Sequence, residues 1–154
     1  GSTLEMETAQ IQGEDSTISV TSGDLDSDSN LIVTEKILTE GTQTAKTIFN
    51  VELNGENSST KVTSRSIAKE NSYQEFVSNV SGNTKCFGHV ECDAIIMDNG
   101  KVVAIPKISA NNVEANLVHE GAIGKIAGDQ LIKLMSLGLT EAQAEEQIIN
   151  GFLK

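Results

Sequence analysis

Short alternating segments, separated by turn signals, follow one another along most of the chain, and they constrain the fold more than any other feature. Within each segment apolar and polar residues alternate, which is typical of half-buried β-strands. The segments start about 11 to 16 residues apart. They are LIVTEKIL (31–38), KTIFNVEL (46–53), TKVTSRSIA (60–68), YQEFVSNV (73–80), CFGHVECDAIIM (86–97) and VVAIPKISA (102–110). The chain is therefore expected to be mainly β.

Two architectures fit such a series of strands: an antiparallel sandwich or barrel, and a parallel β-helix with about two strands in each coil. Periodicity alone does not choose between them. Aromatic residues make up only 3% of the chain and Trp is absent. A β-helix stacks Val, Ile and small residues on their like in the next coil, where large rings fit poorly. The composition thus favours the β-helix and leaves the antiparallel folds open.

A different pattern begins after Glu114, where a segment with three glycines closes the strand region. Asp129 is expected to cap the N-terminus of a first helix, and Gly138 to take the left-handed position after its end. Thr140 and Gln143 have the spacing of a capping box, which starts a second helix. The tail is therefore predicted to be a helical hairpin. Its apolar face either covers the open end of the β-region or docks another protein.

These patterns divide the chain into β-helix coils over residues 1–127 and a C-terminal helical region over residues 128–154. The first ten or so residues are expected to be flexible. The first thirty contain seven acids and no Lys or Arg, so this edge is expected to be solvated. The chain starts with Gly1-Ser2 and has no initiator Met, as is typical of a cloning remnant. We therefore expect a fragment of a longer protein.

Charge and hydropathy exclude several partners. A net charge of −11 disfavours nucleic acid, which binds positive surfaces. No apolar run approaches the ~20 residues that span a bilayer, and the start of the sequence lacks the pattern of a signal peptide. Two cysteines are too few for a disulfide-stapled secreted domain. We expect a cytoplasmic protein with reduced thiols and no membrane contact.

The sequence contains no complete calcium-binding, nucleotide-binding or catalytic motif among those considered. The acids between Asp24 and Glu35 resemble a calcium loop, but Ser29 stands where the sharp turn needs Gly, and strands flank the loop. Two residues separate Gly121 from Gly124, whereas a phosphate-binding loop has four. Neither a nucleophile elbow nor a zinc-protease helix is present. We predict no catalytic residues.

Soft metal donors are concentrated around Cys86, His89 and Cys92. In an extended strand the two cysteines share one face, with apolar neighbours, and His89 lies on the other. A local Cys-His-Cys site would therefore need a bulge, and Cys86 is expected to be a small buried hydrophobic residue.

Cys92 has a second possible set of neighbours. It precedes His119 by 27 residues and Glu120 by 28, roughly one coil of a β-helix. Adjacent rungs lie about 5 Å apart, so a thiolate, an imidazole and a carboxylate are expected to meet there. Such donors suit an iron and sulfide site.

More than half of the sequence resembles a known family, closely from about Ser64 to the end and more weakly from about Leu31. NTKCFGHVECDAIIMDNGKVVAIP (83–106), followed by NLVHEGAIGKIAGDQLIKLMSLGLTEAQAEEQIINGF (116–152), is similar to the C-terminal signature of SufB and SufD scaffold proteins for iron-sulfur cluster assembly. The similarity extends back to SRSIAKENSYQEFVSNV (64–80). It implies a right-handed parallel β-helix with a short C-terminal helical hairpin.

The resemblance also implies partners. A SufB/SufD-type chain pairs with a second such subunit, or with its own copy, receives sulfur from a donor protein and binds a SufC-type ABC ATPase. ATP hydrolysis then belongs to the ATPase, and this chain is not an enzyme. A transient iron-sulfur cluster is expected on the full assembly, with none tightly bound to this fragment. The residues expected to dock the ATPase are Leu131, Leu134, Met135, Ile148 and Phe152.

Carried over by position, Cys92 resembles the SufB cysteine that receives sulfur or holds the cluster, and His119 and Glu120 resemble the SufB His-Glu pair. SufD-like chains generally lack that Cys and Glu, so the chain is SufB-like here. The alternative is a SufD-like structural subunit that organises the ATPase without binding a cluster. A β-helix carbohydrate-active enzyme is disfavoured, because such enzymes line their grooves with aromatic residues and this chain has one Tyr.

Overall fold

The computed structural model describes residues 1–11 and 13–154, which form nine strands followed by two helices. The strands are β1 (Thr3–Gln10), β2 (Ser16–Leu25), β3 (Asn30–Thr39), β4 (Thr44–Leu53), β5 (Ser58–Ala68), β6 (Tyr73–Gly82), β7 (Cys86–Ile96), β8 (Lys101–Ala110) and β9 (Ala115–Gly124). The helices are α1 (Gly128–Ser136) and α2 (Glu141–Phe152).

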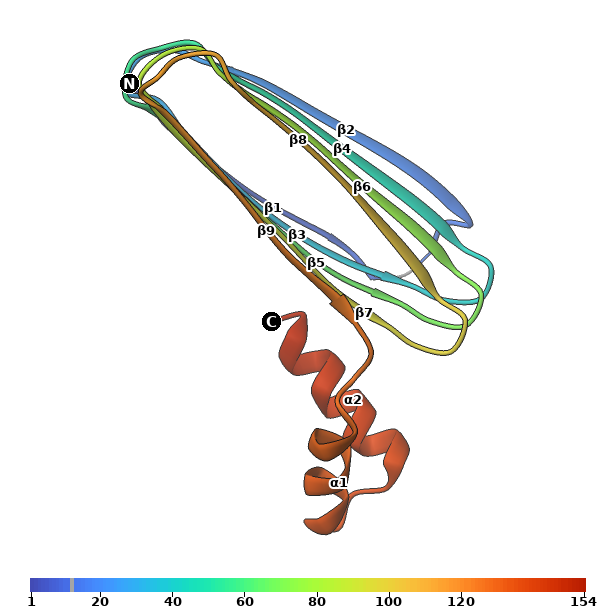
Figure 1. The fold of residues 1–154 in the computed structure, drawn as a ribbon. Helices are drawn as coiled ribbons and strands as arrows, with labels where there is room; N and C mark the ends of the chain where they lie inside the picture. Colours follow the sequence, from blue (N-terminus) through green and yellow to red (C-terminus); the bar gives the residue numbers. More distant parts are fainter. Residues whose placement is uncertain (12) are drawn as a thin grey trace.

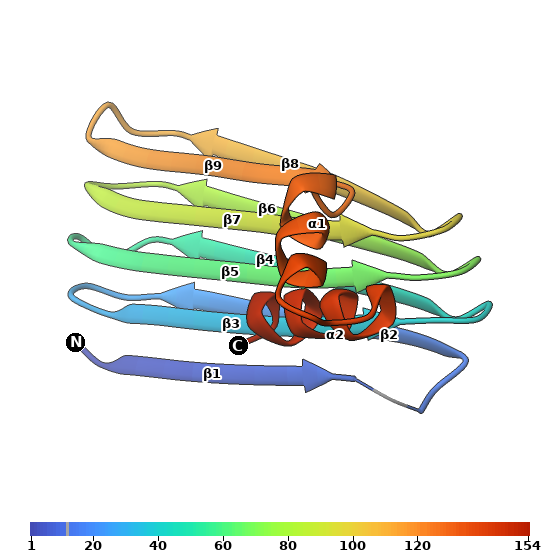
Figure 2. The same cartoon turned by 90° about the horizontal axis from the view of Figure 1, so that it is seen from below.

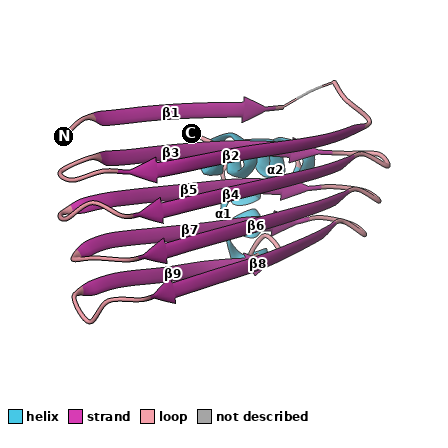
Figure 3. Ribbon diagram, turned by 90° about the horizontal axis from the view of Figure 1, so that it is seen from above, coloured by secondary structure: helices cyan, strands magenta, loops and turns pink. Residues whose placement is uncertain are grey.

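Odd-numbered and even-numbered strands form two separate parallel sheets. The five-stranded sheet has the order β1-β3-β5-β7-β9 and the four-stranded sheet the order β2-β4-β6-β8. Each coil therefore contributes one strand to each sheet, and successive coils stack as rungs (Figures 1 and 3). The structure confirms the mainly β fold, the parallel β-helix and the C-terminal helical hairpin, and it excludes the antiparallel alternatives.

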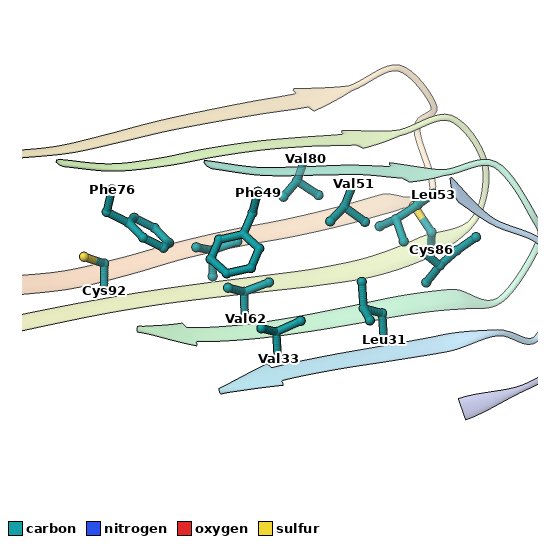
Figure 4. Close-up of a cluster of buried hydrophobic side chains, with 12 residues drawn as sticks. Leu31, Val33, Phe49, Val51, Leu53, Val62, Phe76, Val80, Cys86 and Cys92 are labelled. Atoms are coloured by element: carbon teal, nitrogen blue, oxygen red, sulfur yellow. The ribbon is translucent and has the colours of Figure 1, made fainter. Parts of the chain in front are cut away.

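The core lies between the two sheets and is built from side chains that alternate inward along β3 to β7. In β3, for example, the residues from Leu31 onward are buried at every second position. Twelve buried residues form one cluster between the sheets, and its two aromatic rings, Phe49 and Phe76, lie with their centroids 5.8 Å apart (Figure 4). Apolar burial of this kind is the main stabilising contribution in a domain of this size.

Polar residues at the corners also stack from coil to coil. Asn83 Nδ2 donates to Asn54 Oδ1 (2.6 Å), and Asn111 Nδ2 donates to Asn83 Oδ1 (2.7 Å). Such an amide ladder satisfies side-chain groups at the turns and holds neighbouring coils at one register.

Two parts of the strand series differ from the sequence-based expectation. Residues 3–10, expected to be flexible, form β1, which pairs in parallel with β3. The Gly-rich segment after Glu114, expected to end the strand region, forms β9, which pairs with β7 along ten residues. Both are edge strands, so pairing with an ordered neighbour organises segments whose own strand propensity is weak.

The hairpin confirms one predicted cap and corrects another. Thr140 and Gln143 form the full capping box of α2, and Gly138 has a φ of +97°, as expected after α1. The N-cap of α1 is Ala127, which has no side-chain acceptor, and Asp129 lies in the first turn instead. Its carboxylate accepts from the backbone N–H of Gln130 and interacts favourably with the positive end of the helix dipole.

The hairpin lies over the outer face of the five-stranded sheet and does not cover the end of the coils (Figure 2). Arg65 Nη1 of β5 donates to the carbonyl oxygen of Lys154 (3.3 Å), which links the chain's end to that face. Within residues 1–11 and 13–154, neither helix has the length and apolar character needed to cross a membrane.

Truncation of one core side chain tests this packing. Leu53 is fully buried in the cluster, so Leu53→Ala is expected to lower the free energy of unfolding by about 2–5 kcal/mol. The matched control, Ile132→Ala on the exposed side of α1, is expected to change it by less than about 0.5 kcal/mol. Urea titrations of both variants measure the difference. Equal effects would contradict a solid core between the sheets.

Candidate functional site

The register between β7 and β9 decides which side chains meet Cys92. Cys92 pairs with Gly121, which is 29 residues later, while His119 pairs with Val90 and Glu120 with Glu91. The sequence-based expectation used a coil of 27 or 28 residues. Since side chains alternate along a strand, this small difference decides the face on which each donor lies.

Cys92 points into the core. Its side chain is 1% exposed and lies on the Phe76 side of the interior (Figure 4). Burial, with smaller contributions from the negative charges of Glu35 and Asp93, raises the pKa of the Cys92 thiol to about 11. The thiol is therefore protonated at neutral pH, and it needs a metal ion or a proton acceptor to become a thiolate.

A polar column runs through the core from coil to coil beneath Cys92. Glu35, Ser64, Cys92 and Gly121 follow one another in register on β3, β5, β7 and β9. Ser64 Oγ donates to Glu35 Oε2 (2.8 Å), and Thr47 Oγ1, from the opposite sheet, donates to Glu35 Oε1 (2.7 Å). These bonds satisfy a carboxyl group inside an apolar core.

Burial of Glu35 raises its pKa above the usual value, and the hydrogen bonds from Thr47 and Ser64 only partly oppose that rise. Folding therefore shifts the protonation equilibrium of Glu35 toward its neutral form relative to the unfolded chain. Sequence reasoning considered Glu35 only as the last position of a calcium-loop pattern, and it did not identify Thr47 or Ser64. The signal was available, since Glu35 occupies an apolar position in the alternation of LIVTEKIL, where a charged residue is unusual.

His119 also faces inward, one rung beyond Cys92 and two residues toward the start of its strand. Its Nδ1 is buried and has no hydrogen-bond partner in the described part of the chain. Gly121 follows His119 by two residues on β9 and pairs with Cys92: a Cβ there would be 3.0 Å from the Cys92 carbonyl oxygen and 3.7 Å from His119 Nε2. A side chain at this position would therefore crowd the backbone of Cys92, and glycine permits the close approach of β9 to β7 beside His119.

Glu120 lies on the opposite face, away from Cys92 and His119. It is exposed, and its Oε2 is 3.3 Å from Nε2 of His89, which points outward from β7. The structure therefore brings Cys92 and His119 to one face and places Glu120 with His89 on the other. Sequence reasoning put His89 on the outer face, but it did not identify Glu120 as its neighbour.

Cys86 and Cys92 share the inner face of β7, as the strand alternation predicted, and both are free thiols. Six residues of strand separate them by ~20 Å, and His89 points the other way, so they form no local Cys-His-Cys site. No group of three or more His, Cys, Asp or Glu side chains in residues 1–11 and 13–154 is arranged to hold a metal ion. Two donors therefore lie on each face: Cys92 and His119 form the inner pair, and His89 and Glu120 form the outer pair.

The predicted docking residues fall into two groups. Leu134, Ile148 and Phe152 line a groove between the hairpin and Ile95 of β7, and Leu131 lines a smaller hollow beside Met97. Met135 is exposed to solvent. The two apolar side chains of the hairpin that are most open to a partner, Ile132 at 68% and Leu137 at 75% exposed, were not predicted.

Comparison with protein families gives one match that spans nearly the whole chain. Residues 1–152 match the family described as "SUF system FeS cluster assembly, SufBD core domain". The matched region contains all four donors described above, together with both sheets and the hairpin.

Curated proteins with similar sequences carry related names. An iron-sulfur cluster assembly SufBD family protein of Methanothermobacter thermautotrophicus is 34% identical over 105 residues, covering 67% of this chain and 26% of that protein. A SufBD family protein of Methanocaldococcus jannaschii is 36% identical over 104 residues (67% and 33%). The iron-sulfur cluster assembly protein SufB of Bacillus subtilis is 34% identical over 102 residues (64% and 22%). The chain thus spans no more than a third of these relatives.

The buried carboxyl group gives a pH-dependent prediction. Because the pKa of Glu35 is raised in the folded state, the unfolded chain releases this proton at lower pH. The contribution of Glu35 to the free energy of unfolding therefore falls as the pH rises from its ordinary pKa of 4.5 through its folded pKa. Glu35→Gln removes that fall, so its stability relative to wild type is expected to increase over this pH range in urea titrations.

Glu75→Gln is the matched control, because hydrogen bonds from Lys46 and Tyr73 lower the pKa of Glu75. Its stability relative to wild type is expected to decrease or stay level as the pH rises. A pH-independent difference between Glu35→Gln and wild type would contradict the buried, proton-retaining carboxyl group.

Proposed function

The chain belongs to the SufBD family of iron-sulfur cluster assembly proteins, and from that membership we propose that it is a scaffold subunit on which nascent clusters form before transfer. Its relatives are longer, and the activity proposed here is that of the whole protein. The observation that carries the proposal is the inner pair: Cys92 and His119 lie on the inner face of adjacent strands, two residues apart in register, and His119 Nδ1 is buried without a partner among the described residues.

The chemistry of the inner pair suits iron and sulfide as cargo. A thiol and an imidazole are the donors that iron-sulfur centres use. His119 Nδ1 is buried without a protein partner, a costly arrangement that a bound ion relieves. Because the thiol of Cys92 is held protonated by burial, loading requires that iron or incoming sulfur displace its proton. Cys92 is thus protected from unwanted oxidation while it is empty.

The inner pair alone does not complete a cluster site. Two protein donors leave further coordination positions, and we propose that a second SufB/SufD-type subunit, or a second copy of this one, supplies the remainder. β9 is the last strand of its sheet, so the face that bears Cys92 and His119 adjoins an unpaired strand edge. A sulfur donor protein is expected to deliver sulfur to the same assembly.

The helical hairpin is the proposed dock for a SufC-type ABC ATPase. α1 exposes Ile132 and Met135, and Leu137 follows at its C-cap. Exposed apolar side chains gathered on one short helix are typical of an interface. In this account ATP hydrolysis belongs to the partner, and the present chain holds the cargo.

The second candidate function is that of a SufD-like structural subunit, which organises the ATPase without holding a cluster. The lack of a third metal donor near Cys92 within the described residues favours it. The presence of both Cys92 and Glu120, at the positions where the resemblance places the SufB residues, favours the scaffold role. Cluster loading separates the two functions.

Anaerobic reconstitution of the full-length protein with ferrous iron and sulfide tests the scaffold role. Wild type is expected to develop the visible absorption of an iron-sulfur cluster, and Cys92→Ser is expected to lose most of it because a thiolate donor is gone. The matched control is Cys86→Ser, the same change at the other buried cysteine of β7, which is expected to retain the absorption. Equal loading of all three proteins would favour the structural role.

ATPase docking gives a separate prediction. Replacement of Ile132 and Leu137 by Ser removes exposed apolar area, and it is expected to weaken co-purification of the full-length protein with its ATPase. Val113→Ser, at an exposed apolar residue between β8 and β9, is the control and is expected to have no effect. Unchanged binding in the double variant would place the dock elsewhere.

A further inference from the structure

The outer face of β7 and β9 carries a pair of donors that the inner site does not use. His89 Nε2 and Glu120 Oε2 lie 3.3 Å apart on adjacent strands. The His89 side chain is 21% exposed and that of Glu120 is 65% exposed. Since the chain has two histidines and the other, His119, faces inward, the imidazole groups are divided between the two faces.

The separation of the two atoms matches that of neighbouring ligands on one metal ion. Donors bound at about 2.1 Å lie about 3.0 Å apart in an octahedral arrangement and about 3.4 Å apart in a tetrahedral one. A small rotation of either side chain turns the hydrogen-bonded pair into a nitrogen and an oxygen ligand. Imidazole with carboxylate is a donor set for borderline divalent cations.

We propose that His89 and Glu120 form an outward-facing site for a divalent cation, ferrous iron where the chain acts as the scaffold proposed above, physically separate from the inner pair of Cys92 and His119. The backbone of β7 separates the two faces, because His89 and Cys92 differ in strand parity. The cation site rests on the proposed function only for the identity of its metal.

The charges around the pair support a cation there. Glu91 faces outward in register with Glu120, about 4.8 Å away in the sheet direction, and Asp93 follows on the same face. Two or three carboxylates together attract a positive ion. Lys61 of β5 is in register with His89, so its positive charge lies on the β5 side of the pair. The cation is expected on the opposite side, toward the carboxylates and the open edge of β9.

The site is open rather than closed. The described residues offer no cluster of three donors, so water fills the remaining positions around the ion. Two protein donors hold a metal weakly and release it easily. Weak binding suits a cation that is transferred to another site. A structural metal site differs, because four protein ligands surround its ion.

Cobalt(II) is the probe, because its visible spectrum reports the ligands that it binds. The full chain is titrated anaerobically with cobalt(II), and binding is followed by absorption and by calorimetry. Wild type is expected to bind one ion without the intense thiolate-to-cobalt charge-transfer band. His89→Gln and Glu120→Gln are each expected to weaken binding at least about tenfold.

The control is Glu114→Gln, which removes one exposed carboxylate before β9 and is expected to bind cobalt(II) as wild type does. Circular dichroism of each variant confirms that the outer-face changes leave the fold intact. A thiolate band that disappears in Cys92→Ser, with cobalt(II) binding that is the same in wild type, His89→Gln and Glu120→Gln, would place the ion inside and overturn the proposal. Binding that is unchanged in both His89→Gln and Glu120→Gln would also overturn it.

The outcome for the cation site is independent of that for the scaffold. Weakened cobalt(II) binding in His89→Gln, together with no cluster on wild type, would reject the scaffold and support the cation site. A normal cluster on wild type with unaltered cobalt(II) binding in both outer-face variants would support the scaffold and reject the cation site.

Discussion

In-register parallel pairing between successive coils is the constraint on which the rest of the structure depends. Each coil advances the chain by 27 to 29 residues, as the pairs Thr3 with Asn30 and Cys86 with Ala115 show. Inward side chains therefore stack on inward ones from rung to rung. The turns absorb the differences in coil length, whereas a slip of one residue in the strand pairing would move a strand's side chains to the other face and break the core.

This constraint divides the chemistry of β7 and β9 between two environments. The inner face places Cys92 in register with Ser64 and Glu35 in the buried core, where burial raises the pKa of the thiol and of the carboxyl group. The outer face places His89 with Glu120 in contact with solvent. A thiol protected from solvent and an accessible cation site have opposite requirements, and the alternation of a strand supplies both within a few residues.

Local patterns predicted the parts of the structure that local physics determines. Strict alternation identified β3 to β8, and the Thr140–Gln143 spacing identified the start of α2, because both depend on residues close in sequence. β9 and the face of Glu120 depend instead on pairing with β7, whose register no local signal reveals. Glu35 was missed for the same reason: its partners Thr47 and Ser64 come from other strands.

The central claim is that a 29-residue register places Gly121 opposite Cys92 and so sends Glu120 outward. Interstrand nuclear Overhauser effects in the isotopically labelled protein measure this register directly. The account predicts backbone contacts between Cys92 and Gly121 and between Val90 and His119. Backbone contacts of Cys92 with Glu120 in place of Gly121 would contradict it, since the carboxylate would then lie on the inner face.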